Sequence, residues 1–341
     1  MTTTTEELHP DLQSHAVPAP RHGTRLPWTI ARIAGGALGL LALAAATGAA
    51  YEEIASAGDA TAYPPAGRMV DVGGYKLHLD CRGEGSPAIV LDAGLGSSSL
   101  DWSLVQPELA RSTQVCAFDQ AGMGWSDAGP EPRSPAHIAE ELHALLQNAG
   151  VPGPYVLVGH SLAGKTIRMF AAVHPTDVAG MVLVDARSEI VDATADMKAF
   201  ASALEGQAAQ YSLARRFGIA RLFGGGLIDL PLVPPALATQ MALFQTNPAA
   251  ITTTTQEGLN RTADDEALAA TGLASMPLIV IAAGENMSNP DWAAAQNAMA
   301  KLSTNGTLIV AEGSGHAVHL DQPAIVINAI GHVVDEIHGD T

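Results

Sequence analysis

Basic side chains are scarce in this sequence. It has 17 lysines and arginines against 35 aspartates and glutamates, and its formal net charge is −18. Proteins bind a nucleic-acid backbone mainly through clusters of lysine and arginine, so the charge balance argues against a nucleic acid as partner. Charged residues of either sign make up only 15% of the chain, whereas apolar residues make up 47%. That composition excludes an intrinsically disordered chain.

Cysteine is also rare. The chain has two cysteines, Cys81 and Cys116, and neither belongs to a CxxC pair. The 12 histidines form no HExxH motif. The sequence therefore offers neither of these common zinc-binding patterns. We expect no metal and no cofactor.

One long run near the N-terminus has no charge. Residues 33–50 contain no charged side chain, and several arginines precede them. Such a run is at the short end for a membrane-spanning helix, and basic residues before it place the N-terminus in the cytoplasm. We favour a signal anchor at residues 31–50, between a polar tail (1–30) and a linker (51–68), with the rest of the chain outside the cytoplasm. The alternative is an export signal cleaved near the small residues 55–57, which would give a secreted protein.

Short apolar runs alternate with helical patterns from residue 69 onward. Residues 69–81 read as a β-hairpin around two glycines, and residues 135–150 have apolar side chains at helical spacing. Strands rich in Val, Ile and Leu that alternate with helices predict a mostly parallel sheet covered on both faces. Ligands of such sheets bind at the carboxyl ends of the strands. The runs that we interpret as buried strands are residues 87–94, 113–122, 155–159, 180–186, 277–284 and 306–313.

A long segment interrupts this alternation. Residues 188–272 separate two predicted strands by far more than one crossover, and a connection of that length needs its own structure or a function. We predict a mainly helical cap, inserted into a core formed by residues 69–187 and 273–341. The cap is rich in large apolar residues, which favours an apolar acyl or alcohol group in a substrate. Besides its leucines, these residues include Phe223, Met241 and Phe244.

A serine stands at a sharp strand-to-helix corner in the sequence GHSLAG (residues 159–164). The positions two before and two after such a serine must be small, because strand and helix backbones approach closely there, and Gly159 and Ala163 satisfy this requirement. A serine hydroxyl is a weak nucleophile, so it needs a base, an acid that orients the base, and N–H groups that bind the oxyanion. The alternative is a serine that merely caps a helix.

With four further motifs, this corner makes residues 69–340 resemble the α/β-hydrolase superfamily. The motifs begin at residues 91 (LDAGLGSSSLDW), 118 (FDQAGMGWSD), 157 (LVGHSLAG), 182 (VLVDA) and 313 (GSGHAVHLDQP). The resemblance implies an α/β fold: a mostly parallel central sheet with a leading antiparallel hairpin and a helical cap insertion. It also implies that Ser161 is the nucleophile. Haloalkane dehalogenases and epoxide hydrolases share this fold but use an aspartate as nucleophile, so we expect neither activity.

The resemblance further implies a base and an oxyanion hole. His316 follows the last predicted strand, where the superfamily places its catalytic histidine. The nearby His319 is expected to pack or to cap a helix instead. The backbone N–H groups of Leu162, directly after the nucleophile, and of Leu95, in the loop after the third strand, would bind the oxyanion.

The identity of the acid is open between two arrangements. The common superfamily pattern places an aspartate three residues after a glycine such as Gly284, but Met287 occupies that position. Glu285 and Asp291 remain close to it. A second arrangement places the acid after the sixth strand, where Asp185 stands. We favour Asp185.

Two other expectations concern single residues. The superfamily's strand order makes the strands that hold Cys81 and Cys116 neighbours, so a disulfide between them is conceivable, and two buried reduced thiols are the alternative. Lys165, just after the corner, is expected on the surface of its helix, with a role near the pocket left open.

The sequence therefore predicts a serine-dependent hydrolase of the carboxylesterase type (EC 3.1.1 class), acting on a small ester through an acyl-enzyme on Ser161. Amide, lactone or carbon–carbon bond hydrolysis, or perhydrolysis, in the same pocket are alternatives, because a fold does not fix a substrate. A ligand-binding protein without activity is an alternative from another class. The oligomeric state is left open.

Overall fold

The computed structural model describes residue 2 and residues 28–223 and 233–339. The chain divides into two compact units, residues 1–45 and 46–341. The predicted polar tail (1–30) lies almost entirely outside the described residues.

A single helix, α1 (Trp28–Ala62), contains the predicted anchor segment. Its stretch Trp28–Ser56 has a mean hydropathy of 1.8 and is long and apolar enough to cross a membrane, a description that a signal sequence also meets. The helix continues to Ala62, through much of the segment that we interpreted as a linker. Alanines and glutamates in residues 51–62 favour helix, and two prolines at 64–65 follow its end.

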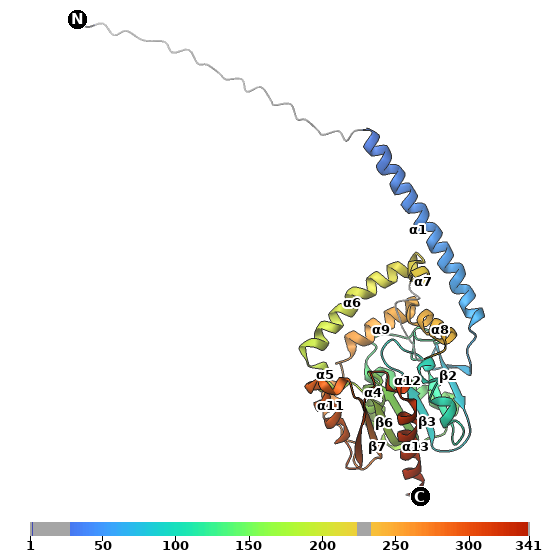
Figure 1. Ribbon diagram of the computed structural model, residues 1–341, viewed down its shortest axis with the longest axis vertical. Helices are drawn as coiled ribbons and strands as arrows, with labels where there is room; N and C mark the ends of the chain where they lie inside the picture. Colours follow the sequence, from blue (N-terminus) through green and yellow to red (C-terminus); the bar gives the residue numbers. More distant parts are fainter. Residues whose placement is uncertain (1, 3–27, 224–232, 340–341) are drawn as a thin grey trace. The chain divides into compact units, whose positions relative to one another are not determined.

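Eight strands form one sheet in the order β1-β2-β4-β3-β5-β6-β7-β8 (Figure 1). β1 pairs antiparallel with β2, and β2 antiparallel with β4, whereas all other neighbours are parallel. The predicted fold class, with its leading antiparallel hairpin, is confirmed. The strands are β1 (Arg68–Asp71), β2 (Lys76–Arg82), β3 (Ala88–Asp92), β4 (Val115–Phe118), β5 (Tyr155–His160), β6 (Val178–Val184), β7 (Leu278–Ala283) and β8 (Gly306–Ala311).

Alternate residues of the central strands pack on opposite faces of the sheet. In β5, Leu157 belongs to an apolar cluster with Leu142 and Phe170. Its neighbour Val158 belongs to a second cluster with Ile330. Because side chains alternate along a strand, both faces must be covered, and this explains the continuous apolar runs of the sequence.

Helices supply these two covers. The first face packs against α3 and α4, and the second against α13. The helices beyond α1 are α2 (Gln106–Leu109), α3 (Pro135–Ala149), α4 (Ala163–Val173), α5 (Glu189–Asp192), α6 (Ala195–Arg216), α7 (Ile219–Phe223), α8 (Pro235–Gln245), α9 (Pro248–Asn260), α10 (Asp265–Ala269), α11 (Pro290–Ala300), α12 (Val318–Asp321) and α13 (Pro323–Gly339). Short 3₁₀ helices lie at η1 (Ser99–Trp102), η2 (Pro175–Asp177) and η4 (Asn286–Ser288).

The connection between β6 and β7 holds the helices α5 to α10. Figure 1 shows α6, α8 and α9, in yellow and orange, gathered beyond one end of the sheet. These helices occupy the segment that we predict to be a cap. Residues 224–232 and the side chain of Phe223 lie outside the described part of the chain.

A disulfide joins Cys81 of β2 to Cys116 of β4. The two residues are direct cross-strand partners in the register of this antiparallel pair. The structure thus has the disulfide and not the pair of reduced thiols. The bridge closes a loop of 35 residues and fastens the leading hairpin to the rest of the sheet.

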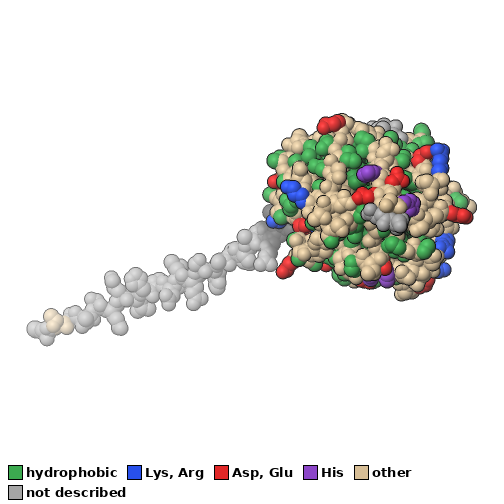
Figure 2. All heavy atoms as spheres, turned by 90° about the horizontal axis from the view of Figure 1, so that it is seen from below, with side chains coloured by type: hydrophobic (Ala, Val, Ile, Leu, Met, Phe, Trp, Pro, Cys, Tyr) green, Lys and Arg blue, Asp and Glu red, His purple; other side chains and the backbone are tan. Residues whose placement is uncertain are grey.

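Charged groups are spread out on the face of the molecule drawn in Figure 2. The few lysine and arginine side chains coloured there lie apart from one another, among hydrophobic, acidic and uncoloured atoms. A basic patch of the kind that binds a nucleic acid is not seen among the described residues on this face.

Candidate active site

The corner that follows β5 holds Ser161 in an uncommon backbone conformation. Its φ is 53°, in the left-handed region that non-glycine residues rarely adopt. Its N–H donates to the carbonyl of Val184 at 3.1 Å, which fixes the turn to β6. A Cβ at Gly159 would lie 2.9 Å from the carbonyl carbon of Ala163, so only glycine fits there. Strain of this kind is kept at functional sites, where the surrounding structure imposes it.

Gly164 stands one place after the second small position of the motif, which Ala163 occupies in this chain. A Cβ at Gly164 would lie 2.5 Å from the Cβ of Ala186, on the segment that follows β6. The close approach of α4 to this segment therefore depends on a glycine one place later than in the usual motif.

Gly164→Ala should lower the free energy of unfolding by about 1–3 kcal/mol, because the added methyl overpacks a buried contact. Gly331→Ala is the matched control: Gly331 lies inside α13, and a Cβ there meets nothing within 4 Å. This control should stabilise the helix by up to about 1 kcal/mol. Denaturant unfolding of the full chain in detergent measures both. Equal stability of the two variants would contradict the close approach.

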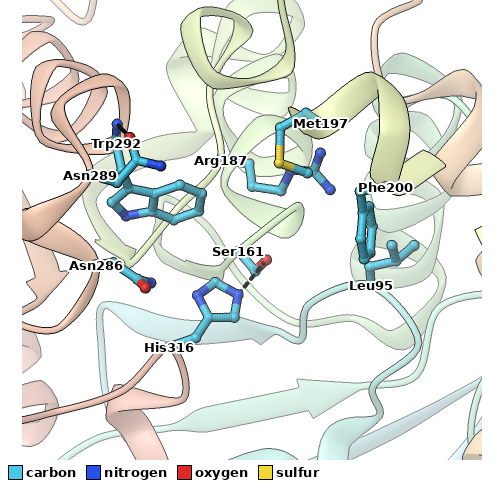
Figure 3. A pocket seen from close by; sticks show the side chains of 9 residues that line it. All are labelled: Leu95, Ser161, Arg187, Met197, Phe200, Asn286, Asn289, Trp292 and His316. Atoms are coloured by element: carbon cyan, nitrogen blue, oxygen red, sulfur yellow. Dashed lines mark hydrogen bonds between the residues drawn. The ribbon is translucent and has the colours of Figure 1, made fainter. Parts of the chain in front are cut away.

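His316 lies between β8 and α12 and contacts Ser161. Its Nε2 is 2.9 Å from Ser161 Oγ, the hydrogen bond dashed in Figure 3. Its Nδ1 is 2.6 Å from Asp185 Oδ2. The side chain of His316 is 43% exposed, whereas that of Asp185 is fully buried. The structure thus brings together Ser161, His316 and Asp185 in an unbroken chain of two hydrogen bonds.

Asp185 is held in place by several donors. Its Oδ1 accepts from the Ala283 N–H at 2.9 Å and from Trp292 Nε1 at 2.8 Å, and its Oδ2 accepts from Asn286 Nδ2 at 2.6 Å. Its φ is 39°, so the backbone at the end of β6 is also in the left-handed region. These contacts fix the carboxylate in the orientation that faces His316.

The other two candidate acids lie elsewhere. Glu285 and Asp291 are exposed, and neither forms a hydrogen bond with His316 among the described residues. The sequence did not indicate Asn286 or Trp292, which hold Asp185. These two residues come from η4 and α11, and no local motif links them to the end of β6.

The predicted oxyanion donors lie on both sides of the serine. Among the described residues, the N–H groups of Leu95 and Leu162 have no hydrogen-bond partner. A Cβ at Gly94 would lie 3.0 Å from Ser161 Cβ and 2.8 Å from His160 Nδ1. Glycine therefore lets the loop after β3 come within contact distance of the nucleophile.

Two further histidines pack beside this site. His160 Nε2 is 3.0 Å from the carbonyl oxygen of His316, and the ring of His319 lies 4.4 Å from that of His160. Burial lowers the pKa of both, to about 3 for His319, and both imidazoles are therefore neutral at pH 7. His319 also packs on Trp102, in agreement with the expected packing role.

The site opens into a cavity of about 390 Å³ (Figure 3). Its wall is partly apolar and partly polar, with contributions from the core and from α6. The residues that line it are Leu95, Ser161, Arg187, Met197, Phe200, Asn286, Asn289, Trp292 and His316. Met241 and Phe244 are not among them, since Met241 packs with Val233 and Leu320 and Phe244 packs on Trp125. These two residues therefore give no support to an apolar group in the substrate, which stays a prediction.

The expected surface position of Lys165 was wrong. Its side chain is fully buried and pairs with Asp192 and Asp265. These carboxylates belong to α5 and α10, which cover the face of α4 that an isolated helix would expose.

One group of side chains could hold a metal ion. Glu140, His143 and His174 have potential ligand atoms that lie within 4.8 Å of one another. They come from α3 and from the residue that ends α4. The sequence did not indicate this group, because its members are distant along the chain. They are not among the residues that line the cavity at Ser161.

Comparison with known proteins assigns this chain to a family. Residues 89–329 match the alpha/beta hydrolase family, and because this stretch is more than half of the chain, the chain belongs to that family. The predicted family resemblance is confirmed.

Individual relatives match to different extents. YqjL of Bacillus subtilis is 25% identical over 264 residues, which cover 76% of this chain and 88% of YqjL. A Hormonema carpetanum protein named "Probable transporter efuK" is 35% identical over 129 residues, which are 36% of this chain but only 18% of efuK. The chain thus spans less than a fifth of the length of efuK.

Solved structures agree in fold. An esterase from Thermogutta terrifontis has 20% identity and a TM-score of 0.62, over 80% of this chain and 98% of the esterase. The epoxide hydrolase CorEH has 20% identity and a TM-score of 0.63, over 76% of this chain and 95% of that chain. The two neighbours carry out different reactions, so likeness at this level establishes the fold and does not select the chemistry.

Proposed function

We propose that this protein is a serine hydrolase that cleaves a carboxylic ester through an acyl-enzyme on Ser161. The observation that carries the proposal is the two-bond chain Ser161–His316–Asp185, with distances of 2.9 and 2.6 Å. A serine at a nucleophile elbow, a histidine within hydrogen-bond reach and a carboxylate on the far side of the imidazole are the parts that acyl transfer requires. Membership of the alpha/beta hydrolase family supports it.

The reaction follows from these contacts. As Ser161 Oγ attacks the ester carbonyl carbon, His316 Nε2 takes the hydroxyl proton. The carbonyl oxygen becomes an oxyanion, which accepts hydrogen bonds from the N–H groups of Leu95 and Leu162. Collapse of this intermediate breaks the ester bond, and His316 returns the proton to the leaving alkoxide. A water molecule, deprotonated by His316, then attacks the carbonyl carbon of the acyl-enzyme. This second intermediate collapses, the bond to Ser161 Oγ breaks as the acid leaves, and His316 returns the proton to Oγ.

Asp185 has a supporting role in this scheme. Its Oδ2 accepts a hydrogen bond from the Nδ1–H of His316, so Nε2 has a free lone pair facing Ser161. The charge of the carboxylate stabilises the imidazolium that forms. Because Trp292 and Asn286 donate to the same carboxylate, its orientation needs no adjustment during the reaction.

Ester turnover by the full chain in detergent tests the proposal. We expect hydrolysis of p-nitrophenyl esters and rapid labelling by a fluorophosphonate, which reacts only with an activated serine. Turnover of esters with acyl chains of rising length would then show how long an acyl group the cavity accepts. Labelling without ester turnover would point to an amide, a lactone or another acyl substrate. Absence of both would overturn the proposal in favour of a binding protein.

We propose further that α1 anchors the chain in a membrane with the catalytic unit outside the cytoplasm. The length and hydropathy of Trp28–Ser56 support this placement, and so does the Cys81–Cys116 disulfide, since disulfides persist in oxidising compartments. The chain should stay with the membrane fraction after extraction at alkaline pH. Release of a fragment beginning near residue 58 would instead favour a cleaved signal, and release of the intact chain would contradict anchoring by α1.

A further inference from the structure

Buried cations beside the pocket outnumber the carboxylates that pair with them. Lys165, Arg187 and Arg261 surround Asp192, whose side chain is fully buried. Lys165 Nζ is 2.8 Å from Asp192 Oδ2, and Arg261 Nε is 3.5 Å from Asp192 Oδ1. Lys165 also pairs with Asp265. Within the described part of the chain, this cluster therefore has three cations and two carboxylates, and a buried charge without a counter-charge is strongly unfavourable.

Arg187 is the member of this cluster that reaches the cavity. It is only 4% exposed, yet it lines the same cavity as Ser161 and His316 (Figure 3). One guanidinium nitrogen donates to Asp192, but its Nε is buried with no hydrogen-bond partner among the described residues. Burial lowers the pKa of Arg187, but an arginine still keeps its charge at neutral pH. Its charge is thus only partly compensated by the protein.

The backbone fixes Arg187 close to the nucleophile. Its N–H donates to the carbonyl oxygen of Ser161 at 2.9 Å, and it stands two residues after Asp185. The guanidinium also lies against Phe200 of α6, with its carbon 5.8 Å from the ring centre. When the carbonyl of an acyl group is bound at Ser161, the rest of the acyl group lies in the cavity, and Arg187 forms part of the wall of that cavity.

We propose that the substrate's acyl group carries a carboxylate and that Arg187 binds this carboxylate. The inference rests on the proposed function and names its substrate class: monoesters of short dicarboxylic acids. A carboxylate in this position would accept hydrogen bonds from the guanidinium and would bring the cluster to three cations and three anions. A hydrogen-bonded pair of a guanidinium and a carboxylate is among the strong polar contacts in proteins.

The remaining features of the cavity suit such a substrate. Met197, Phe200 and Trp292 offer apolar surface to the methylene groups between the two carbonyl carbons. The net charge of −18 disfavours an anionic ligand at long range, but that repulsion is screened beyond about 8 Å at physiological ionic strength. A local buried cation is therefore what an anionic substrate requires.

A matched pair of esters tests the proposal. The p-nitrophenyl monoester of glutaric acid and p-nitrophenyl valerate have acyl chains of equal carbon number and differ in the terminal carboxylate. For the full chain in detergent, we expect the kcat/KM of the glutarate monoester to exceed that of the valerate by about 10- to 100-fold, the range of a hydrogen-bonded charge pair.

Variants of Arg187 identify the source of this preference. Arg187→Gln should abolish this preference, so that the ratio of the two kcat/KM values falls to about one, and this ratio is the readout. Arg187→Lys, which keeps the charge, should retain part of the preference. Arg111→Gln is the control, since Arg111 is exposed and, among the residues that the structure describes, its side chain pairs with Glu108 alone. It should leave both esters unaffected.

Calorimetric titration with glutarate separates this proposal from the esterase proposal. If neither ester is hydrolysed but glutarate binds the wild-type chain and not Arg187→Gln, the anion site stands and the esterase proposal fails. If both esters are hydrolysed equally well and glutarate does not bind, the anion site is overturned and the esterase proposal stands. A preference for glutarate that survives in Arg187→Gln would also overturn it.

Discussion

Ser161→Ala should lower kcat for a p-nitrophenyl ester by about 10⁴- to 10⁶-fold, the loss that follows removal of a serine nucleophile elsewhere. Without Oγ no acyl-enzyme forms, and the hydrogen bond to His316 is lost as well. Any remaining turnover would come from binding and from the oxyanion hole alone. Fluorophosphonate labelling should disappear in the same variant.

Ser188→Ala is the matched control for this experiment. Ser188 is also buried, follows the same sheet edge and has no hydrogen-bond partner for its hydroxyl among the described residues, but it does not line the cavity. Its turnover should stay close to that of the wild type. Turnover by Ser161→Ala comparable with this control would mean that the reaction proceeds through another group.

Asp185→Asn should lower kcat by about 10⁴-fold while leaving the chain folded. An amide in place of the carboxylate can donate to His316 Nδ1, which would leave the proton on Nε2 and remove the base that faces Ser161. The amide also lacks the charge that stabilises the imidazolium. Steady-state kinetics with p-nitrophenyl esters measures the effect.

The two rejected acids provide the controls. Glu285→Gln and Asp291→Asn change exposed side chains that are not bonded to His316 in the described structure, so both variants should stay within about 2-fold of wild type. Near-normal turnover in Asp185→Asn, with loss in either of these variants, would assign the acid to the end of β7 and not to the end of β6.

The sequence alone was sufficient to locate the corner that holds Ser161 and to predict most of the sheet. Ser161 follows directly after β5, His316 lies in the loop after β8, and the turn around the serine has its own local requirements for small residues. The positions of these two residues depend on short stretches of chain, which periodicity and motif spacing can locate.

The acid and the cavity wall depend on contacts that no local pattern records. Asp185 could be distinguished from Asp291 only once β6 was placed beside β7 and His316 was seen to face it. The burial of Lys165 was missed for the same reason, because residues some hundred positions later cover its side of α4. Sequence periodicity identifies the apolar face of a helix but not the element that will cover a polar one.

The burial of Lys165 has a consequence for how a ligand enters the site. If α5 and α10 lifted away from α4, the ammonium group would lose both of the carboxylates with which it pairs. We therefore expect these two short helices to stay packed on α4. The longer α6, which bears Met197 and Phe200, would move to admit the ligand. Amide hydrogen exchange should accordingly be slow in α5 and α10 and fast in α6. The two short helices of the insertion would then stay fixed on the core, and α6 would open the cavity.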